Sequence, residues 1–202
     1  MKERPILFSG EMVRAILEGR KTQTRRVVKP QPTIVHAIYK DASISTNLIF
    51  RSGDQRIHCP FGQPGDRLWV RETWGLVTHH DLTDWCGGSI KGVPEAELRE
   101  QFFIEHAANW KVPNEFAYWR PSIHMPRWAS RLTLEITAVR VERLQDIGEE
   151  DAKAEGVTIT EYYSMSRNPH RSAFIDLWNT CYGPESWNAN PWVWVIEFRR
   201  VA

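Results

Sequence analysis

Hydrophobic residues near the start of the chain follow first a strand pattern and then a helix pattern. Residues 5–9 form a short apolar run that predicts a β-strand. After it, apolar residues recur at helical spacing, which predicts an amphipathic helix with Ser9 as its N-cap and Gly19 as its stop. The apolar stripe of this helix consists of Met12, Val13, Ile16 and Leu17. Residues 22–28 are extended again, so we expect a strand–helix–strand unit.

Apolar runs farther along the chain predict more strands and two more helices. The strands are expected over 34–39, 44–51, 67–74, 129–144 and 191–200, and the helices over 148–154 and 171–181. Short strands, turns and few helices predict an α+β fold, a small mixed β-barrel with flanking helices. In the strand at 67–74, Leu68, Val70 and Glu72 share one face, which places a carboxylate on an otherwise aliphatic surface.

Residues 76–117 differ in texture from the rest of the chain. They combine a histidine pair, a Cys-Gly-Gly sequence and a helical pattern from Pro94 to Ala108, with proline in the first turn of that helix. We interpret this segment as an insertion into a single domain that spans residues 1–202. A length of 202 residues fits one domain with an insertion better than two domains.

Composition and charge limit the classes of partner. Hydrophobic residues make up 42% of the chain and charged residues 25%, which is ordinary for a globular protein, and the formal net charge is +1. A chain so close to neutral is not a general polyanion binder, so contact with nucleic acid must come from a local patch. No apolar run is long enough to cross a bilayer, and the first residues lack the apolar core of a signal peptide. We therefore expect a cytoplasmic protein without membrane contact.

The spacing of cysteine and histidine gives little support for a metal site. His58, Cys59, His79, His80 and Cys86 offer suitable ligand atoms, but no CxxC or HxxxH pair occurs. The three cysteines are far apart in the sequence and do not suggest a disulfide framework. We therefore expect neither a metal nor another cofactor.

The candidate chemistry lies directly after the stop of the first helix. Lys21, Thr24, Arg25 and Arg26 follow Gly19 within a few residues. A lysine that burial deprives of water can lose its proton near neutral pH and act as a base toward a hydroxyl such as that of a nearby threonine. The guanidinium groups could hold a developing negative charge or a phosphate. A solvated basic turn would carry the same residues, so this spacing leaves both interpretations open.

The wider sequence resembles a known family. Gly-Arg-Lys-Thr-Gln-Thr-Arg at 19–25, preceded by an amphipathic helix, is similar to the signature of the ASCH-domain family. Further matching parts, in chain order, are Pro-Gly-Asp-Arg-Leu-Trp-Val at 64–70, Leu-Thr-Leu-Glu-Ile-Thr-Ala-Val at 132–139, Glu-Asp-Ala-Lys-Ala-Glu-Gly at 150–156 and Trp-Val-Ile-Glu-Phe at 194–198. The stretch at 119–131 resembles larger members common in bacteriophages and prophages. The resemblance covers well over half the chain and implies a β-barrel related to the RNA-binding PUA fold.

The resemblance also implies an activity and a set of residues. Some small ASCH proteins are amidohydrolases that remove the acetyl group from N4-acetylcytidine with a lysine, a threonine and a glutamate. These map onto Lys21, Thr24 and, in a shorter match, Glu155 at the end of the 148–154 helix. Lys21 would activate Thr24 or a water, Glu155 would orient Lys21 or protonate the leaving amine, and a backbone N–H or Arg26 would stabilise the oxyanion. The chain is about twice as long as the minimal enzymes, and the 76–117 segment bears on whether the pocket is open.

Three further residues are candidates for substrate binding. Glu72 would either point into the barrel or pair with Arg26, Arg67 or another arginine. Arg127 and Trp128 would either hold a nucleobase between a guanidinium and a ring or form a packed corner fixed by neighbouring prolines.

The sequence leaves three functions open. They are an amidohydrolase acting on a modified nucleoside, an RNA-binding module without catalysis, and a ribonuclease. The combination of Lys21, Thr24 and Glu155 favours the hydrolase. Several arginines favour RNA contact: Arg20, Arg25, Arg26, Arg127 and Arg131. The near-neutral total charge disfavours tight binding over a long footprint of RNA.

Overall fold

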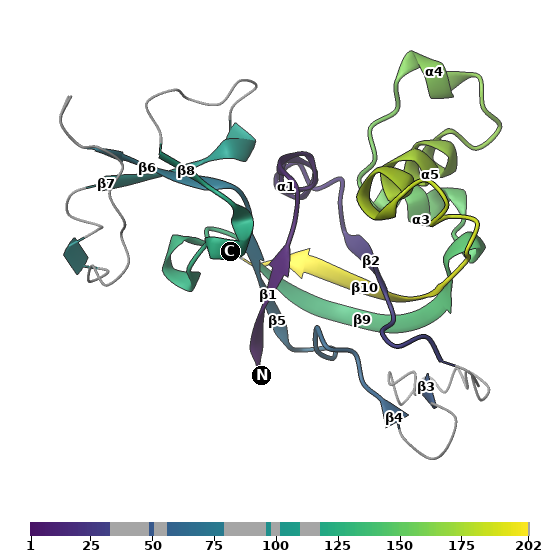
Figure 1. The fold of residues 1–202 in the computed structure, drawn as a ribbon, viewed down its shortest axis with the longest axis horizontal. Coiled ribbons are helices and arrows are strands. Elements are labelled where there is room, and N and C mark those ends of the chain that lie inside the picture. The colour runs from purple at the N-terminus through teal and green to yellow at the C-terminus, as the bar shows by residue number, and fades with distance from the viewer. Residues whose placement is uncertain (33–48, 51–55, 79–95, 98–101, 110–117, 202) are drawn as a thin grey trace.

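The main body of the protein is a five-stranded mixed sheet. The computed structural model describes residues 1–32, 49–50, 56–78, 96–97, 102–109 and 118–201 (Figure 1). The strands run in the order β1-β5-β9-β10-β2. Their bounds are Glu3–Leu7 for β1, Arg67–Arg71 for β5, Thr133–Arg143 for β9, Trp192–Arg200 for β10 and Gln23–Val27 for β2. β1 and β5 are parallel and the other neighbours are antiparallel, so the prediction of an α+β fold with a mixed sheet is confirmed.

The sheet is not a closed barrel in the part of the chain that the structure describes. β1 and β2 are its two edge strands, and no ladder joins them among these residues. A side-chain contact spans the gap: Arg26 of β2 donates from Nη2 to the carbonyl of Leu7 at the end of β1, 2.6 Å away. The curved sheet therefore brings its edges near each other without pairing them there.

Strand β10 is buried on both faces. Val193 and Val195 face a cluster that includes Phe174 and Trp178, while alternate residues of the strand face the larger core beneath α1. These alternate residues are Trp194, Ile196 and Phe198. A strand with both faces buried needs a continuous apolar run rather than an alternating one, which explains the sequence Trp-Val-Trp-Val-Ile.

Beside the sheet, the described part of the chain contains four helices of four or more residues. They are α1 (Gly10–Leu17), α3 (Glu149–Ala154), α4 (Glu161–Ser164) and α5 (Pro169–Tyr182). Ser9 caps α1 by accepting the backbone N–H of Met12, and Gly19 follows the helix with a φ of +74°, as predicted. In Figure 1, α3 and α5 lie together beside one end of the long β9–β10 pair, and α1 lies between them and a second sheet. Short 3₁₀ turns occupy Ala107–Asn109, Ser122–His124, Arg127–Ala129 and Leu144–Asp146.

The second sheet contains three antiparallel strands in the order β7-β6-β8, and it has its own core. Their bounds are Phe102–His106, Trp74–Thr78 and Tyr118–Arg120. The predicted helix from Pro94 to Ala108 is wrong over 102–106, where the chain is β7, although Ala96 and Glu97 are helical. Phe102 and His106 are buried and Phe103 is exposed, and the pairing of β7 with β6 makes this stretch a strand.

The remaining described strands form a small ribbon. β3 (Ile49–Phe50) pairs with β4 (Arg56–Ile57). The strand predicted over 34–39 and most of the one over 44–51 lie outside the described residues. In the part of the chain that the structure describes, no helix has the length and apolar character needed to cross a membrane.

Candidate active site at Lys21 and Glu155

Backbone contacts bring Lys21 next to Glu155, although 134 positions separate them in the sequence. After α1 the chain turns at Gly19, and the N–H of Lys21 donates to the carbonyl of Ala15 at 3.0 Å. Lys21 and Glu155 then form an isolated antiparallel β-bridge, and the N–H of Thr22 donates to the carbonyl of Ala154 at 2.9 Å. The main chain itself therefore places the lysine against the end of α3.

The side chain of Lys21 is buried and bound to Glu155. The residue is 2% exposed. Its Nζ lies 2.8 Å from Glu155 Oε2 and 2.8 Å from the Glu155 carbonyl oxygen. The interpretation as a solvated basic turn is therefore wrong for this residue. Burial lowers the pKa of Lys21, and the negative charge of Glu155 only partly opposes that change.

Gly156 allows the end of α3 to lie this close to Lys21. Its φ is +77°, and a Cβ added there would lie 2.7 Å from the Cβ of Lys21 and 2.9 Å from that of Ala15. Both the left-handed backbone and the lack of space require glycine at this position. The Glu-Gly pair in the sequence is thus a geometric requirement of the lysine site.

Arg25 is fixed by three carboxylates. Its guanidinium lies 3.0 Å from Glu155, 2.5 Å from Glu142 and 2.9 Å from Asp151. Arg140 joins the network by pairing with the same Glu142 and Asp151. With its side chain fully buried and its donors occupied, Arg25 orients Glu155 rather than binding a phosphate from outside.

Thr24 shares a small cavity with this ion-pair network. Thr24 is 3% exposed, and the cavity has a volume of about 40 Å³. Its wall is formed by Met12, Thr24, Arg25, Arg26, Glu155, Phe174, Leu177, Trp178, Cys181 and Tyr182. A buried water needs about 10–15 Å³, so this cavity has room for roughly three water molecules and is too small for an aromatic ring.

A larger hollow of about 390 Å³ adjoins the small cavity. The two share Met12, Glu155 and Leu177 in their walls. The hollow is otherwise formed by Glu11, Gly156, Val157, Thr158, Thr160, Tyr163, Ala173, Asp176 and Thr180. Glu155 therefore lies at the junction of a space for a few atoms and a space for a small molecule. None of the described residues of 76–117 lines either one.

Glu72, Arg127 and Trp128 do not line these cavities. Glu72 is 1% exposed and accepts from Arg131 at 3.0 and 3.1 Å, which is the arginine pairing considered from the sequence. Arg127 pairs with Glu3, and its guanidinium lies 6.0 Å from the ring centre of Trp69. Trp128 packs edge-on against Trp74, which matches the packed corner. Of the four candidates for substrate binding, only Arg26 lines the small cavity, whose wall also contains Glu155, the partner of Lys21.

The site also contains residues that the sequence did not indicate. Asp151 and Glu142 anchor Arg25, and Trp178 of α5 lines the small cavity. The helical pattern of α5 predicted a packed face with Trp178, but it did not reveal that part of this face borders a cavity. Cys181, placed on the same face by its spacing, is exposed.

Other chemistry-bearing groups lie elsewhere. Cys59, His58 and Asp66 line a separate hollow of about 310 Å³, where burial raises the pKa of the Cys59 thiol and makes it a poor nucleophile at neutral pH. Among the described residues, no group of three or more His, Cys, Asp or Glu is placed to hold a metal ion. His79, His80 and Cys86 lie outside those residues.

Comparison of the chain with models of known protein families, with curated proteins and with solved structures finds no match.

Proposed function

We propose that this protein is an amidohydrolase that removes a small acyl group from the amino group of a modified nucleoside, with N4-acetylcytidine as the representative substrate. The observation that carries the proposal is the buried Lys21–Glu155 pair, in which Glu155 lines both cavities and shares the wall of the smaller one with Thr24. A lysine with a lowered pKa, a hydroxyl and a carboxylate are the parts that amide hydrolysis by this route requires, and Glu155 connects the lysine to the cavity that Thr24 lines.

The reaction can be assigned to these groups step by step. Neutral Lys21 takes a proton from the Thr24 hydroxyl or from a water, and the freed oxygen bonds to the acyl carbon. The C–N bond then breaks, its electron pair passes to the nucleoside nitrogen, and the Lys21 ammonium returns the proton to that nitrogen. The products are the free nucleoside amine and, directly or after water cleaves an acyl-threonine ester, the carboxylic acid.

Glu155 is better suited to orienting Lys21 than to donating a proton. Its two oxygens accept from Lys21 and Arg25 at 2.8 and 3.0 Å, so both are already engaged as hydrogen-bond acceptors. In this role Glu155 holds Nζ in place and stabilises the ammonium that forms during the reaction. Of the two roles that the sequence left open, the contacts support the orienting one.

The arrangement of the matched motifs supports a relationship to the ASCH-domain family. The segments that resemble the family form α1 with β2, β5, β9, α3 and β10, and four of them are strands of the same five-stranded sheet. The shorter Glu-Gly match at the end of α3 contacts the Lys-Thr-Gln-Thr motif directly. We propose on this basis a PUA-like sheet.

RNA binding without chemistry has weaker support. Two of the arginines that favoured it are occupied inside the protein, Arg25 by three carboxylates and Arg131 by Glu72, while Arg20 forms an exposed pair with Glu18. Acidic groups around Arg25 and Arg140 would repel a phosphate backbone at the same place. We therefore rank the nucleoside hydrolase above the RNA-binding module and the ribonuclease.

The decisive experiment is chromatography of N4-acetylcytidine after incubation with the protein. We expect cytidine and acetate to appear with the unchanged protein and to be lost with Thr24→Val, while the control Thr133→Val, at a buried threonine away from both cavities, remains active. Activity in Thr24→Val but not in a Lys21 variant would indicate an activated water. Shortening of an RNA oligonucleotide without nucleoside turnover would replace this proposal with the ribonuclease.

A further inference from the structure

The wall of the small cavity contains two hydrogen-bond donors that the protein does not use. The Nε of Arg26 and the indole Nε1 of Trp178 are both buried and have no hydrogen-bond partner among the described residues. Both side chains line the 40 Å³ cavity. Buried N–H groups almost always have a partner, and exceptions call for an explanation such as a bound ligand or water.

These two donors are held in place by their other contacts. Arg26 donates from Nη2 to the carbonyl of Leu7, and its guanidinium lies 5.3 Å from the ring centre of Phe8. Trp178 is 3% exposed and stacks on Tyr182 with the ring centres 4.2 Å apart. Neither group is therefore free to turn its N–H toward bulk water, which preorganises both for an acceptor inside the protein.

Their position distinguishes them from other buried donors without partners. Six such side-chain atoms occur in the described part of the chain, and the other four belong to Arg67, Arg71, Arg120 and Trp74. None of those four residues lines the small cavity. The one carboxylate in its wall, that of Glu155, already accepts from Lys21 and Arg25. Both donors without a partner in this region thus belong to residues of the cavity wall, and the carboxylate in that wall already accepts from other groups.

We infer that the small cavity is the subsite for the acyl group, and that its carbonyl oxygen accepts hydrogen bonds from Arg26 Nε and Trp178 Nε1. This inference rests on the proposed function. Room for about three water-sized centres matches the three heavy atoms of an acetyl group. The nucleoside then occupies the 390 Å³ hollow, and the scissile C–N bond crosses the junction at Glu155.

The same arrangement assigns a role in the reaction to the two donors. When an oxygen attacks the acyl carbon, the carbonyl oxygen gains negative charge, and two fixed donors together with the positive charge of Arg26 stabilise it. A volume of about 40 Å³ also limits the size of the acyl group, so the site should favour acetyl over longer acyl chains.

The test follows the indole N–H signals of the ten tryptophans by ¹H–¹⁵N NMR while acetamide is added as the carbonyl probe. Trp178→Phe identifies the signal and removes the donor but keeps an aromatic ring. Trp187→Phe is the matched control, because Trp187 packs against the same core without lining the cavity. We expect acetamide to shift the Trp178 signal selectively. We also expect Trp178→Phe to lower kcat for N4-acetylcytidine by about 10²-fold, the loss typical of one oxyanion donor, while Trp187→Phe keeps its rate.

The outcomes separate this inference from the proposed function. An unmoved Trp178 signal, or a Trp178→Phe enzyme as fast as the unchanged protein, overturns the acyl subsite even if hydrolysis is observed. A selective shift without any hydrolysis retains the carbonyl-binding site and overturns the amidohydrolase. If Trp178→Phe does not fold, Arg26→Lys removes the other donor while keeping the charge, and an unchanged kcat in that variant overturns the subsite.

Discussion

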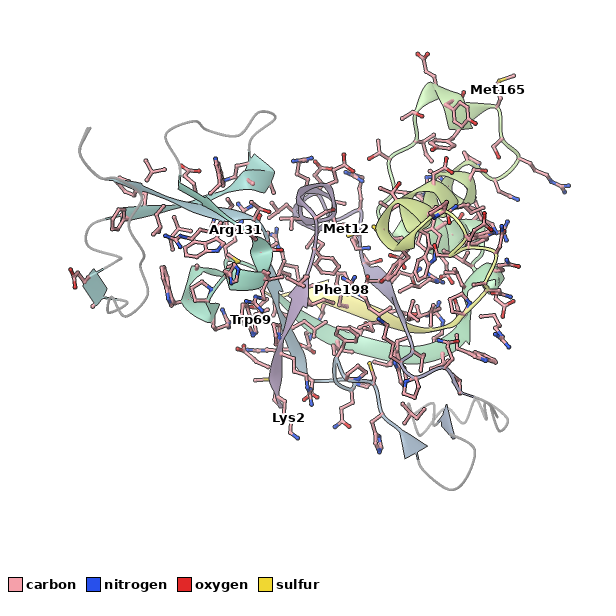
Figure 2. All side chains as sticks on the ribbon, viewed as in Figure 1. Lys2, Met12, Trp69, Arg131, Met165 and Phe198 are labelled. Carbon is pink, nitrogen blue, oxygen red and sulfur yellow. The ribbon has the colours of Figure 1, made fainter. Side chains whose placement is uncertain are left out.

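Glu155 and Glu72 are both buried carboxylates bound by arginine, yet their surroundings differ. Glu72 is matched by a single cation, Arg131, through two hydrogen bonds. Glu155 is shared between Arg25 and Lys21, and it lies where two cavities meet. In Figure 2, Arg131 lies toward the three-stranded sheet, while Met12, a cavity residue, lies on the side of α1 that faces α5.

The comparison shows what separates a structural ion pair from a reactive one. A buried carboxylate with one well-aligned arginine satisfies both groups and leaves nothing for a ligand. A carboxylate that also holds a buried lysine of lowered pKa, next to open space, keeps a group that can exchange protons. Burial of a charged residue alone therefore says little, and its partners and the adjoining volume carry the functional information.

The largest expected effect is the loss of activity in Lys21→Met. Removing the base should lower kcat/KM for N4-acetylcytidine by about 10²- to 10⁴-fold. Glu155 keeps Arg25 as a partner, so the carboxylate is not left unpaired and the melting temperature should change less than in the Arg131 variant described next. The measurements are cytidine release and thermal unfolding. A fully active Lys21→Met would remove the distinction between the two carboxylates.

Arg131→Met should show the opposite behaviour. It leaves Glu72 buried without its cation, which we expect to lower the free energy of unfolding by about 3 kcal/mol. This value is at the low end for breaking a buried ion pair, because Arg131 is itself partly exposed. For a chain of this length that corresponds to a melting temperature lower by about 6–12 °C. The rate per folded molecule should stay the same. A selective loss of rate without loss of stability would give Glu72 a functional role after all.

The pH dependence of the reaction should identify the lysine. Only the unprotonated amine can act as a base, so kcat/KM should rise with pH through the folded-state pKa of Lys21, about tenfold for each pH unit below it. Because burial lowers that pKa, the rise should be complete below the ordinary lysine value of 10.5. The charge of Glu155 raises the pKa of Lys21, so in Glu155→Gln the rise should move to lower pH. An unmoved profile in this variant would assign the titration to another group.

The last prediction compares two glycines with similar backbones. Gly156→Ala puts a Cβ against Lys21, whereas Gly19→Ala, at a φ of +74°, meets nothing within 4 Å. Both should lose about 1–2 kcal/mol for the left-handed backbone, and Gly156→Ala a further ~1–3 kcal/mol for crowding. Only Gly156→Ala should also lower activity, because the lysine must shift. Denaturant unfolding and cytidine release measure the two losses, and equal losses in the two variants would show that the close contact is unimportant.

Much of the main sheet could be predicted from local pattern. The stripe of α1 with its Ser9 cap and the long apolar runs of β9 and β10 are strong local signals. The failure at Phe102–His106 has a physical cause: these five residues pair with β6 as a strand inside a longer stretch that has helical composition. The sequence predicted no strand at the residues of β8, which forms by pairing with β6.

The candidate site was predictable only in part. The resemblance placed Lys21, Thr24 and Glu155 together, and the lysine–glutamate contact is what the structure shows. Nothing in the sequence indicated that Arg25 would be bound by Glu142 and Asp151, because those contacts join residues more than a hundred positions apart. The same limit applies to Trp178: an amphipathic pattern marks a buried face, and it cannot distinguish a ring packed on all sides from one that borders a cavity.

The double burial of β10 has a consequence for how the molecule opens. One strand serves as the wall of two hydrophobic clusters, so its amides can exchange with solvent only when both clusters separate, and they should belong to the most slowly exchanging set. The cluster that contains α5 covers a single face of that strand. Local opening of α5 would uncover the cavity walls that this helix forms, while the sheet and the Lys21–Glu155 bridge persist. Substrate entry and global unfolding would then be separate events.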